Sequence, residues 1–199
     1  MVHQITSDFL SLEKIKQIFE KDATLELSEE SSEKIVACRS YLDEKVKRSE
    51  HPIYGINTGF GSNANQSIEE EDLSQLQWNL VTSHACGMGD EVPLEIVKLM
   101  ILLKIQGLSH GYSGVQLATV QRLIDFYNEG VYPVIYEQGS LGASGDLAPL
   151  AHLSLPLLGE GEVDYKGERI SGKALNERMG WEPITLQSKE GLALLNGTQ

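Results

Sequence analysis

The stretch that begins at Pro93 is the feature that most constrains the fold. Proline suits the first turn of a helix, and the helix predicted over 94–107 is apolar on most of its sides. Such a helix is deeply buried, because a surface helix would carry a polar face. Its densest apolar run, 99–105, is short and carries Lys104, so it falls well below the ~20 apolar residues of a membrane span. The segment therefore predicts a helix inside a globular core.

Four further segments have apolar residues at helical spacing, and they begin at Ser7-Asp8 (8–20), Ser28, Ser67 and Ser113 (to Asn128). Ser28 can cap the second of these helices, with a buried stripe at Ile35, Cys38, Leu42 and Val46. Ser67 and Glu70 have the spacing of a capping box. These segments predict a mainly helical chain.

Signals for β-strands are few. The run VYPVIY at 131–136 is a weak strand signal, and EVDYKGERI at 162–170 predicts a hairpin that turns at Lys166-Gly167. No internal repeat, low-complexity tract or linker divides the chain. We therefore expect one mainly α domain, over 1–199, with a few short β-strands or hairpins.

Composition excludes several classes of partner. Hydrophobic residues make up 41% and charged residues 23% of the chain, as is ordinary for a soluble globular protein. The formal net charge of −13 argues against nucleic acid and against anionic membranes. The two cysteines, Cys38 and Cys86, have no C-x-x-C spacing, and 1–10 does not resemble a secretory signal. We expect a cytoplasmic protein with reduced thiols.

Two segments rich in Gly, Asn and Ser, at 54–67 and 137–145, resist the helical pattern. These residues allow positive φ and a close approach of the backbone to a ligand. Ordered loops of this kind usually carry function. We expect the chemistry of the chain to lie here.

The loop around Ser144 fits neither a hydrolase nor a nucleotide site. A nucleophile elbow is G-x-S-x-G, whereas the glycine before Ser144 stands one residue early, at Gly142. The phosphate-loop and dinucleotide patterns are absent too, and no His, Cys or carboxylate cluster has zinc-site spacing. We expect neither a metal nor a nucleotide. A plain helix-entry loop, with Ser144 or Asp146 as the N-cap of 147–155, is the alternative to a reactive site.

A third chemistry fits the small residues that flank the serine. The amide nitrogen of Gly145 is unhindered and can fold back onto the carbonyl of Ala143 if the loop is sharply bent. Closure of that ring, with loss of water there and from Ser144, would leave an exocyclic methylene on an imidazolone. This group is a strong electrophile, which no ordinary side chain supplies.

Four stretches of the sequence together resemble one family. They are GSLGASGDLAPLAH at 139–152, YGINTGFG at 54–61, NLVTSHACG at 79–87 and EGLALLNGTQ at 190–199. The chain is similar in these to the aromatic amino acid ammonia-lyases that build a methylidene-imidazolone (MIO), and among them most to those that act on histidine. The resemblance implies the N-terminal part of their helical, fumarase/aspartase-like fold, and MIO formed from Ala143, Ser144 and Gly145.

The resemblance also implies roles for other residues. Tyr54 looks like the tyrosine proposed as base for the β-proton of the substrate. His84 resembles the histidine that meets the substrate side chain, and Asn196 the asparagine near the electrophile and substrate. Asp146 would help to shape the cyclising loop. Taken without the resemblance, Asn196-Gly197 indicates a turn or a helix stop, and His84 an ordinary core or surface histidine.

The implied reaction converts L-histidine to trans-urocanate and ammonia, in a cytoplasmic homotetramer. The chain departs from the family at Tyr136 and Gln138, where many members have proline and lysine. It is also much shorter than family members, so we expect an N-terminal fragment that lacks the C-terminal helical bundle and is inactive alone. Two alternatives stay open: a catalytically silent interaction domain with an uncyclised Ala-Ser-Gly loop, or a parent enzyme that is a tyrosine or phenylalanine ammonia-lyase or aminomutase.

Overall fold

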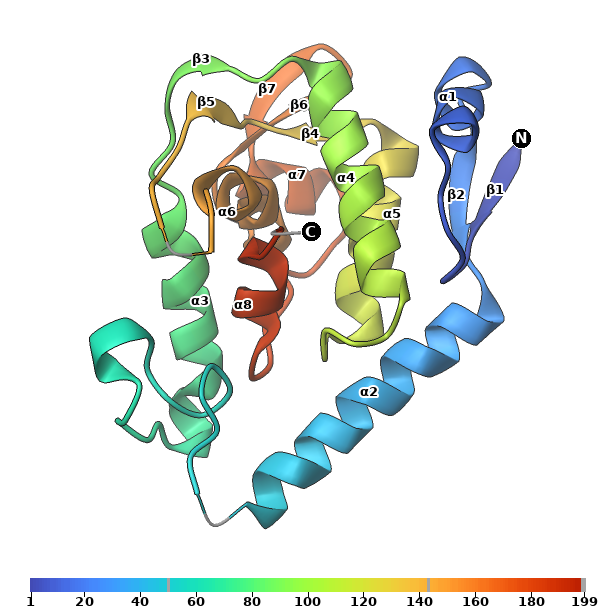
Figure 1. Ribbon diagram of the computed structural model, residues 1–199. Coiled ribbons are helices and arrows are strands. Elements are labelled where there is room, and N and C mark those ends of the chain that lie inside the picture. The colour runs from blue at the N-terminus through green and yellow to red at the C-terminus, as the bar shows by residue number, and fades with distance from the viewer. Residues whose placement is uncertain (50, 143, 198–199) are drawn as a thin grey trace.

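The predicted central helix is present. The computed structural model describes residues 1–49, 51–142 and 144–197. Helix α4 (Leu94–Ser109) lies beside α5 (Leu117–Glu129) in the middle of the molecule (Figure 1). Ile101, Leu102 and Ile105 of α4 are fully buried, as expected of a helix that is apolar on most sides.

The other helices surround this pair, and Figure 1 shows α2 as a long rod along one edge. Their bounds are α1 Leu12–Glu20, α2 Glu29–Arg48, α3 Leu73–His84, α6 Ala148–Ser154, α7 Gly172–Met179 and α8 Glu190–Leu195. Short 3-10 turns span Gly61–Asn63, Glu70–Asp72 and Leu155–Leu158. The mainly helical prediction is confirmed, and no helix in the described ranges is long and apolar enough to cross a membrane.

Of the helix starts predicted from serine residues, that at Ser28 is right, and those at Ser7-Asp8, Ser67 and Ser113 are wrong, the last because α5 begins only at Leu117. The Ser28 side chain accepts a hydrogen bond from the Ser31 amide, so Ser28 caps α2 as predicted. Helix α1 begins at Leu12 with Ser11 as its cap, because the residues at 6–8 bond to one another instead. The Ser67–Glu70 capping box does not form: Ser67 pairs with Thr58 across the preceding loop, and a 3-10 turn leads into α3.

The strands form three small sheets: a parallel pair of β1 (Val2–Ile5) and β2 (Thr24–Leu27), an antiparallel pair of β3 (Met88–Glu91) and β5 (Tyr136–Gln138), and an antiparallel sheet of β4 (Val131–Pro133), β6 (Glu162–Tyr165) and β7 (Glu168–Ser171). The hairpin turn at Lys166-Gly167 is confirmed, with φ of 52° and 80°. The run at 131–136 is not one strand, because its two ends join different sheets.

Three helices bring the sequence motifs together. Helices α3, α6 and α8 pack against one another, and α6 follows directly after the Ala-Ser-Gly loop. In Figure 1, α3 and α8 run in the same direction beside α6. The helix end that carries His84 and the one that carries Asn196 therefore belong to the same helical cluster as the loop.

Candidate active site

The Ala-Ser-Gly loop is closed at its base by one carboxylate. Asp146 Oδ1 accepts hydrogen bonds from the backbone N–H of Ser140 at 2.7 Å and of Ala148 at 3.1 Å, and from the Ser140 hydroxyl at 3.2 Å. The carboxylate thus ties the strand side of the loop to the first residue of α6. A Cβ added to Gly139 would lie 1.9 Å from Asp146 Oδ2, so only glycine leaves room for this closure.

Ser144 and Gly145 lie within the loop that Asp146 closes. Ser144 and Gly145 are exposed, and Ala143 falls outside the described residues. Gly145 has a φ of 90°, and its N–H donates to the carbonyl of Gly142 at 3.2 Å. The backbone is therefore sharply bent at Gly145, and nothing crowds the position of a Cβ there. The residues present are compatible with MIO formation.

His84 ends α3 with its ring turned back onto the helix. Its Nδ1 lies 2.8 Å from the carbonyl oxygen of Leu80. A carbonyl only accepts, so Nδ1 carries the hydrogen, and in the neutral ring Nε2 is then an acceptor. The half-buried ring therefore offers Nε2 to a ligand that carries a donor.

A histidine that the sequence analysis did not single out joins two of the motifs. His152 of α6 accepts the N–H of Gly87 at its Nε2, at 2.9 Å, and its ring meets Tyr136 edge-on at 5.2 Å. Burial lowers the pKa of His152, which favours the neutral ring that this hydrogen bond requires. Together with the β3–β5 pair, the bond fastens the segment after His84 to the segments on both sides of the loop.

Asn196 follows the last turn of α8 and is half-buried. Its side-chain Nδ2 donates to the carbonyl of Leu192 at 3.2 Å, which leaves Oδ1 without a partner among the described residues. A Cβ on Gly197 would lie 2.7 Å from Cδ1 of Leu150, so the Asn196-Gly197 segment is pressed against α6. Helix α8 ends at Leu195 and the backbone of Asn196 is extended, so of the two plain readings the helix stop is the correct one.

Tyr54 reaches the same helices from another side. Its neighbour Gly55, at a φ of 73°, has its Cβ position 3.0 Å from Leu192 of α8, so the 54–61 loop docks on that helix. The Tyr54 ring meets Phe60 edge-on at 6.1 Å, but 60% of Tyr54 is exposed. No hydrogen bond joins Tyr54, His84 and Asn196 to one another in the described structure.

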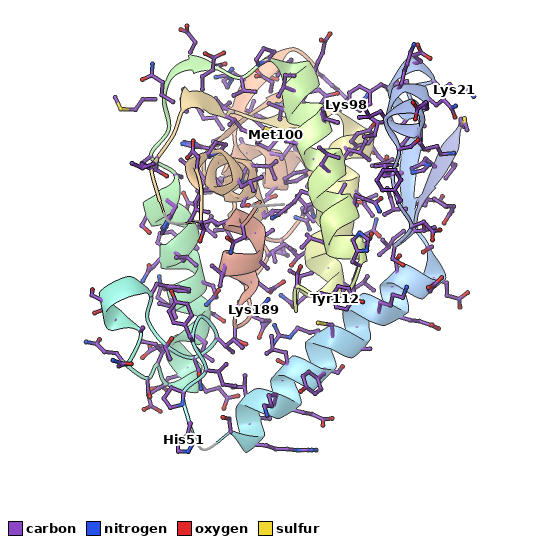
Figure 2. The ribbon with its side chains drawn as sticks, viewed as in Figure 1. Lys21, His51, Lys98, Met100, Tyr112 and Lys189 are labelled. Carbon is purple, nitrogen blue, oxygen red and sulfur yellow. The ribbon has the colours of Figure 1, made fainter. Side chains whose placement is uncertain are left out.

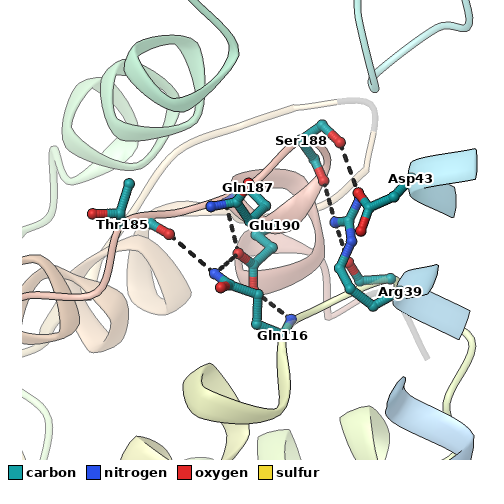
Figure 3. A network of polar contacts seen from close by, with 8 residues as sticks. Arg39, Asp43, Gln116, Thr185, Gln187, Ser188 and Glu190 are labelled. Atoms are coloured by element: carbon teal, nitrogen blue, oxygen red, sulfur yellow. Dashed lines mark hydrogen bonds and ion pairs between the residues drawn. The ribbon is translucent and has the colours of Figure 1, made fainter. Parts of the chain in front are cut away.

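A buried carboxylate that the sequence did not single out fixes the start of α8. Glu190 is fully buried, and Figure 3 shows it between Gln116 and Gln187. Its Oε1 accepts from the Gln116 N–H and the Thr119 hydroxyl, both at 2.8 Å. Its Oε2 accepts from Gln116 Nε2 at 2.6 Å and from the Gln187 N–H at 2.7 Å. The one available signal was a glutamate directly before an apolar run.

Arg39 of α2 continues this network, as Figure 3 shows. Its Nη1 donates to the carbonyls of Gly114 at 2.7 Å and Ser188 at 2.8 Å, and its Nη2 pairs with Asp43. On the other side of α8, the Gly191 N–H donates to Oε1 of the buried Gln77 at 2.9 Å. The helix that carries Asn196 is therefore held rigidly at its first turn. In the part of the chain described, no group of three His, Cys, Asp or Glu side chains could hold a metal ion.

Comparison with known proteins decides the family. Residues 10–199 match the model of the family described as aromatic amino acid lyase. The chain belongs to the aromatic amino acid lyase family. The match covers all four motifs, so the resemblance seen in the sequence is confirmed.

Relatives in this family include histidine ammonia-lyases. The chain is 53% identical to that of Legionella pneumophila over 96% of its own length and 37% of the relative's. It is 48% identical to that of Myxococcus xanthus, over 98% and 38%. The chain thus spans well under half the length of these relatives.

Solved structures agree with the fold. The histidine ammonia-lyase of Trypanosoma cruzi superposes with a TM-score of 0.88 at 38% identity, over 100% of this chain and 38% of that one. The phenylalanine aminomutase of Pantoea agglomerans gives 0.90 at 35% identity, over 99% and 37%. The structure is therefore that of the N-terminal part of this lyase fold.

Proposed function

We propose that this chain is the electrophile-bearing, N-terminal domain of a histidine ammonia-lyase, which converts L-histidine to trans-urocanate and ammonia. The observation that carries the proposal is the carboxylate of Asp146, which closes the loop around Ser144 and bends it back beside the Gly145 nitrogen. The identity of about half of all residues with histidine ammonia-lyases supports the same reaction.

Ala143, Ser144 and Gly145 would form the MIO group, which supplies an electrophile that takes up the substrate amine so that the amine can leave. Asp146 would hold the loop in the shape from which the ring closes. Tyr54 would remove the β-proton of the substrate, and Asn196 would present its Oδ1 to the substrate or the electrophile. No metal or nucleotide is needed.

His84 would select the substrate side chain. Because Nδ1 is bonded within the helix, Nε2 can accept a hydrogen bond from the imidazole N–H of histidine. A phenyl ring offers no such donor, so this arrangement favours histidine over phenylalanine. A site built to hydrogen-bond a substrate group discriminates strongly against an analogue without it.

We propose that the remaining parts of the enzyme, a C-terminal helical bundle and the contacts of a homotetramer, lie outside this chain. The exposed position of Tyr54 and the absence of direct bonds among Tyr54, His84 and Asn196 support a site that these 199 residues do not complete. The chain alone would then be inactive, while its parent would be a lyase.

Intact mass spectrometry of the chain tests the electrophile. If the fold of the chain alone enforces cyclisation, the mass of the wild type should be lower than that of the unmodified sequence by two water molecules. Ser144→Ala should keep both of these water molecules. Urocanate absorbance in the full-length protein tests the reaction, again against Ser144→Ala. Equal urocanate formation by both proteins would refute the electrophile, and turnover of tyrosine or phenylalanine without histidine would refute the substrate assignment.

An uncyclised, catalytically silent domain is the second candidate. The Gly145 N–H is engaged with the Gly142 carbonyl at 3.2 Å, an arrangement that a linear loop can keep. An unmodified mass for the wild-type chain, together with a dehydrated full-length protein, would show that ring closure needs the rest of the enzyme.

A further inference from the structure

Lys104 is a buried cation inside the most apolar helix of the molecule. It lies on α4, and only 8% of the residue is exposed. Burial lowers the pKa of Lys104 to about 8, with no opposing contribution from a neighbouring charge. A lysine in such a place is costly, so the contacts that it makes deserve an explanation.

Both contacts of the Lys104 ammonium lie at the end of α8. Its Nζ donates to the carbonyl oxygen of Ala193 at 2.7 Å and to that of Asn196 at 2.8 Å. The last carbonyls of a helix have no partner within the helix, and inside a core they need a donor from elsewhere. Lys104 supplies that donor from a helix that is 89 residues earlier in the chain than Ala193.

The same segment also contacts α6. Gly197 lies against Leu150, where an added Cβ would be 2.7 Å from Cδ1. Helix α6 begins directly after the loop that carries Ser144, and Asp146 bonds to its first residue, Ala148. The position of Asn196 relative to the loop therefore depends on the contacts that the end of α8 makes with both α4 and α6.

We propose that Lys104 is a positioning residue, which clamps the end of α8 by tying the carbonyls of Ala193 and Asn196 to α4 and so sets the place of the Asn196 side chain beside the electrophile loop. An apolar residue at 104 would fill the space but leave two part-buried carbonyls without the donor that Lys104 supplies. The end of α8 would then shift or fray to reach water, and Asn196 would move with it. The contacts of Lys104 do not depend on the proposed function; only the catalytic role of Asn196 rests on it.

The test compares Lys104→Met with Lys98→Met in the isotope-labelled chain. Lys98 lies near the other end of α4 (Figure 2), where it pairs with Asp22 at 2.7 Å. In Lys104→Met we expect the side-chain amide resonance of Asn196 to shift, and its backbone amide to exchange with solvent about ten-fold faster or more. Lys98→Met should leave both unchanged. A folded Lys104→Met protein whose Asn196 signals match those of Lys98→Met would overturn the proposal.

A measurement on the wild type keeps the test decisive if Lys104→Met does not fold. The ammonium protons of Lys104 should exchange slowly enough to be detected and should show nuclear Overhauser effects to Asn196. Exchange as fast as that of the exposed Lys47 would contradict the clamp. Neither readout needs the electrophile, so a full-length protein without the electrophile would refute the proposed function, while a chain that passes this test would still support the clamp.

In a protein that forms urocanate, a positioning role has a kinetic signature. Lys104→Met should lower kcat about ten-fold or more, with a smaller change in KM, because Asn196 would act on the reacting atoms. Lys98→Met should keep the wild-type kcat. A kcat of Lys104→Met equal to that of Lys98→Met would show that the clamp has no part in the reaction.

Discussion

Replacement of Glu190 by glutamine should destabilise the protein strongly, although the two side chains have nearly the same shape. The carboxylate accepts four hydrogen bonds and is fully buried. An amide can place its NH2 toward Thr119, whose hydroxyl can rotate to accept, but the N–H of Gln116 then faces a donor. One buried backbone N–H without an acceptor costs about 1–3 kcal/mol, and the bonds that remain lose the strengthening that the charge gave them.

The expected loss in the free energy of unfolding is therefore about 2–4 kcal/mol, a large share of the ~5–15 kcal/mol typical of a domain. Urea unfolding followed by circular dichroism measures it as a lower midpoint with an unchanged slope. Glu177→Gln, on the exposed face of α7, is the matched control and should change the stability by no more than about 0.5 kcal/mol. If the two variants had the same midpoint, the reasoning that the Glu190 network anchors α8 would be refuted.

Three further predictions concern pH and packing. Because burial lowers the pKa of Lys104 to about 8 from 10.5, the unfolded state binds more protons between these values, so stability should rise with pH there by up to about 3 kcal/mol. The urea midpoint of the wild type, plotted against pH, should therefore rise relative to that of Lys104→Met between these two values and run parallel to it above them. Two curves that are parallel over the whole range would contradict the lowered pKa. The lowered pKa of His152 predicts stability that is complete above 6.5 and declines as the pH falls below it; His152→Gln should flatten that decline in thermal melts. Gly87→Ala should cost about 1–3 kcal/mol, since its Cβ would press on His152 Nε2 at 3.0 Å, whereas Gly107→Ala, in open space within α4, should stabilise by up to about 1 kcal/mol. Melting temperatures that change in the same direction for both glycines would contradict this.

Local chemistry made part of the fold predictable. The apolar surface of α4, the cap at Ser28 and the turn at Lys166-Gly167 each depend on residues close together in the sequence, and all three are confirmed. The cap expected at Ser67 does not form, because Ser67 pairs instead with Thr58. Thr58 lies in a loop, and the spacing of apolar residues in a helix gives no information on how that loop folds.

Long-range contacts account for most of what was missed. The sequence analysis did not predict strand β3, which forms because the distant β5 pairs with it, Met88 with Gln138 and Glu91 with Tyr136. Lys104 appeared in the sequence only as an interruption of an apolar run, since its two acceptors belong to a distant helix. The site residues themselves were located by motif, and their roles remain predictions.

Residues of the closed loop are constrained either by the shape of the loop or by its proposed chemistry. A comparison of homologous sequences would not distinguish these two constraints. At position 139 a side chain is excluded by space, and at 145 by a φ of 90°, so both glycines are needed for shape whether or not any reaction occurs. Ser144 is exposed, at a kind of position where replacement ordinarily changes stability by about 0.5 kcal/mol or less. A mutational scan scored for folding alone should therefore tolerate many residues at 144 and almost none at 139 or 145. Substitutions at 144 that fail only when the scan is scored for dehydration or urocanate would report the requirement of the reaction for serine, separately from the requirement of the fold.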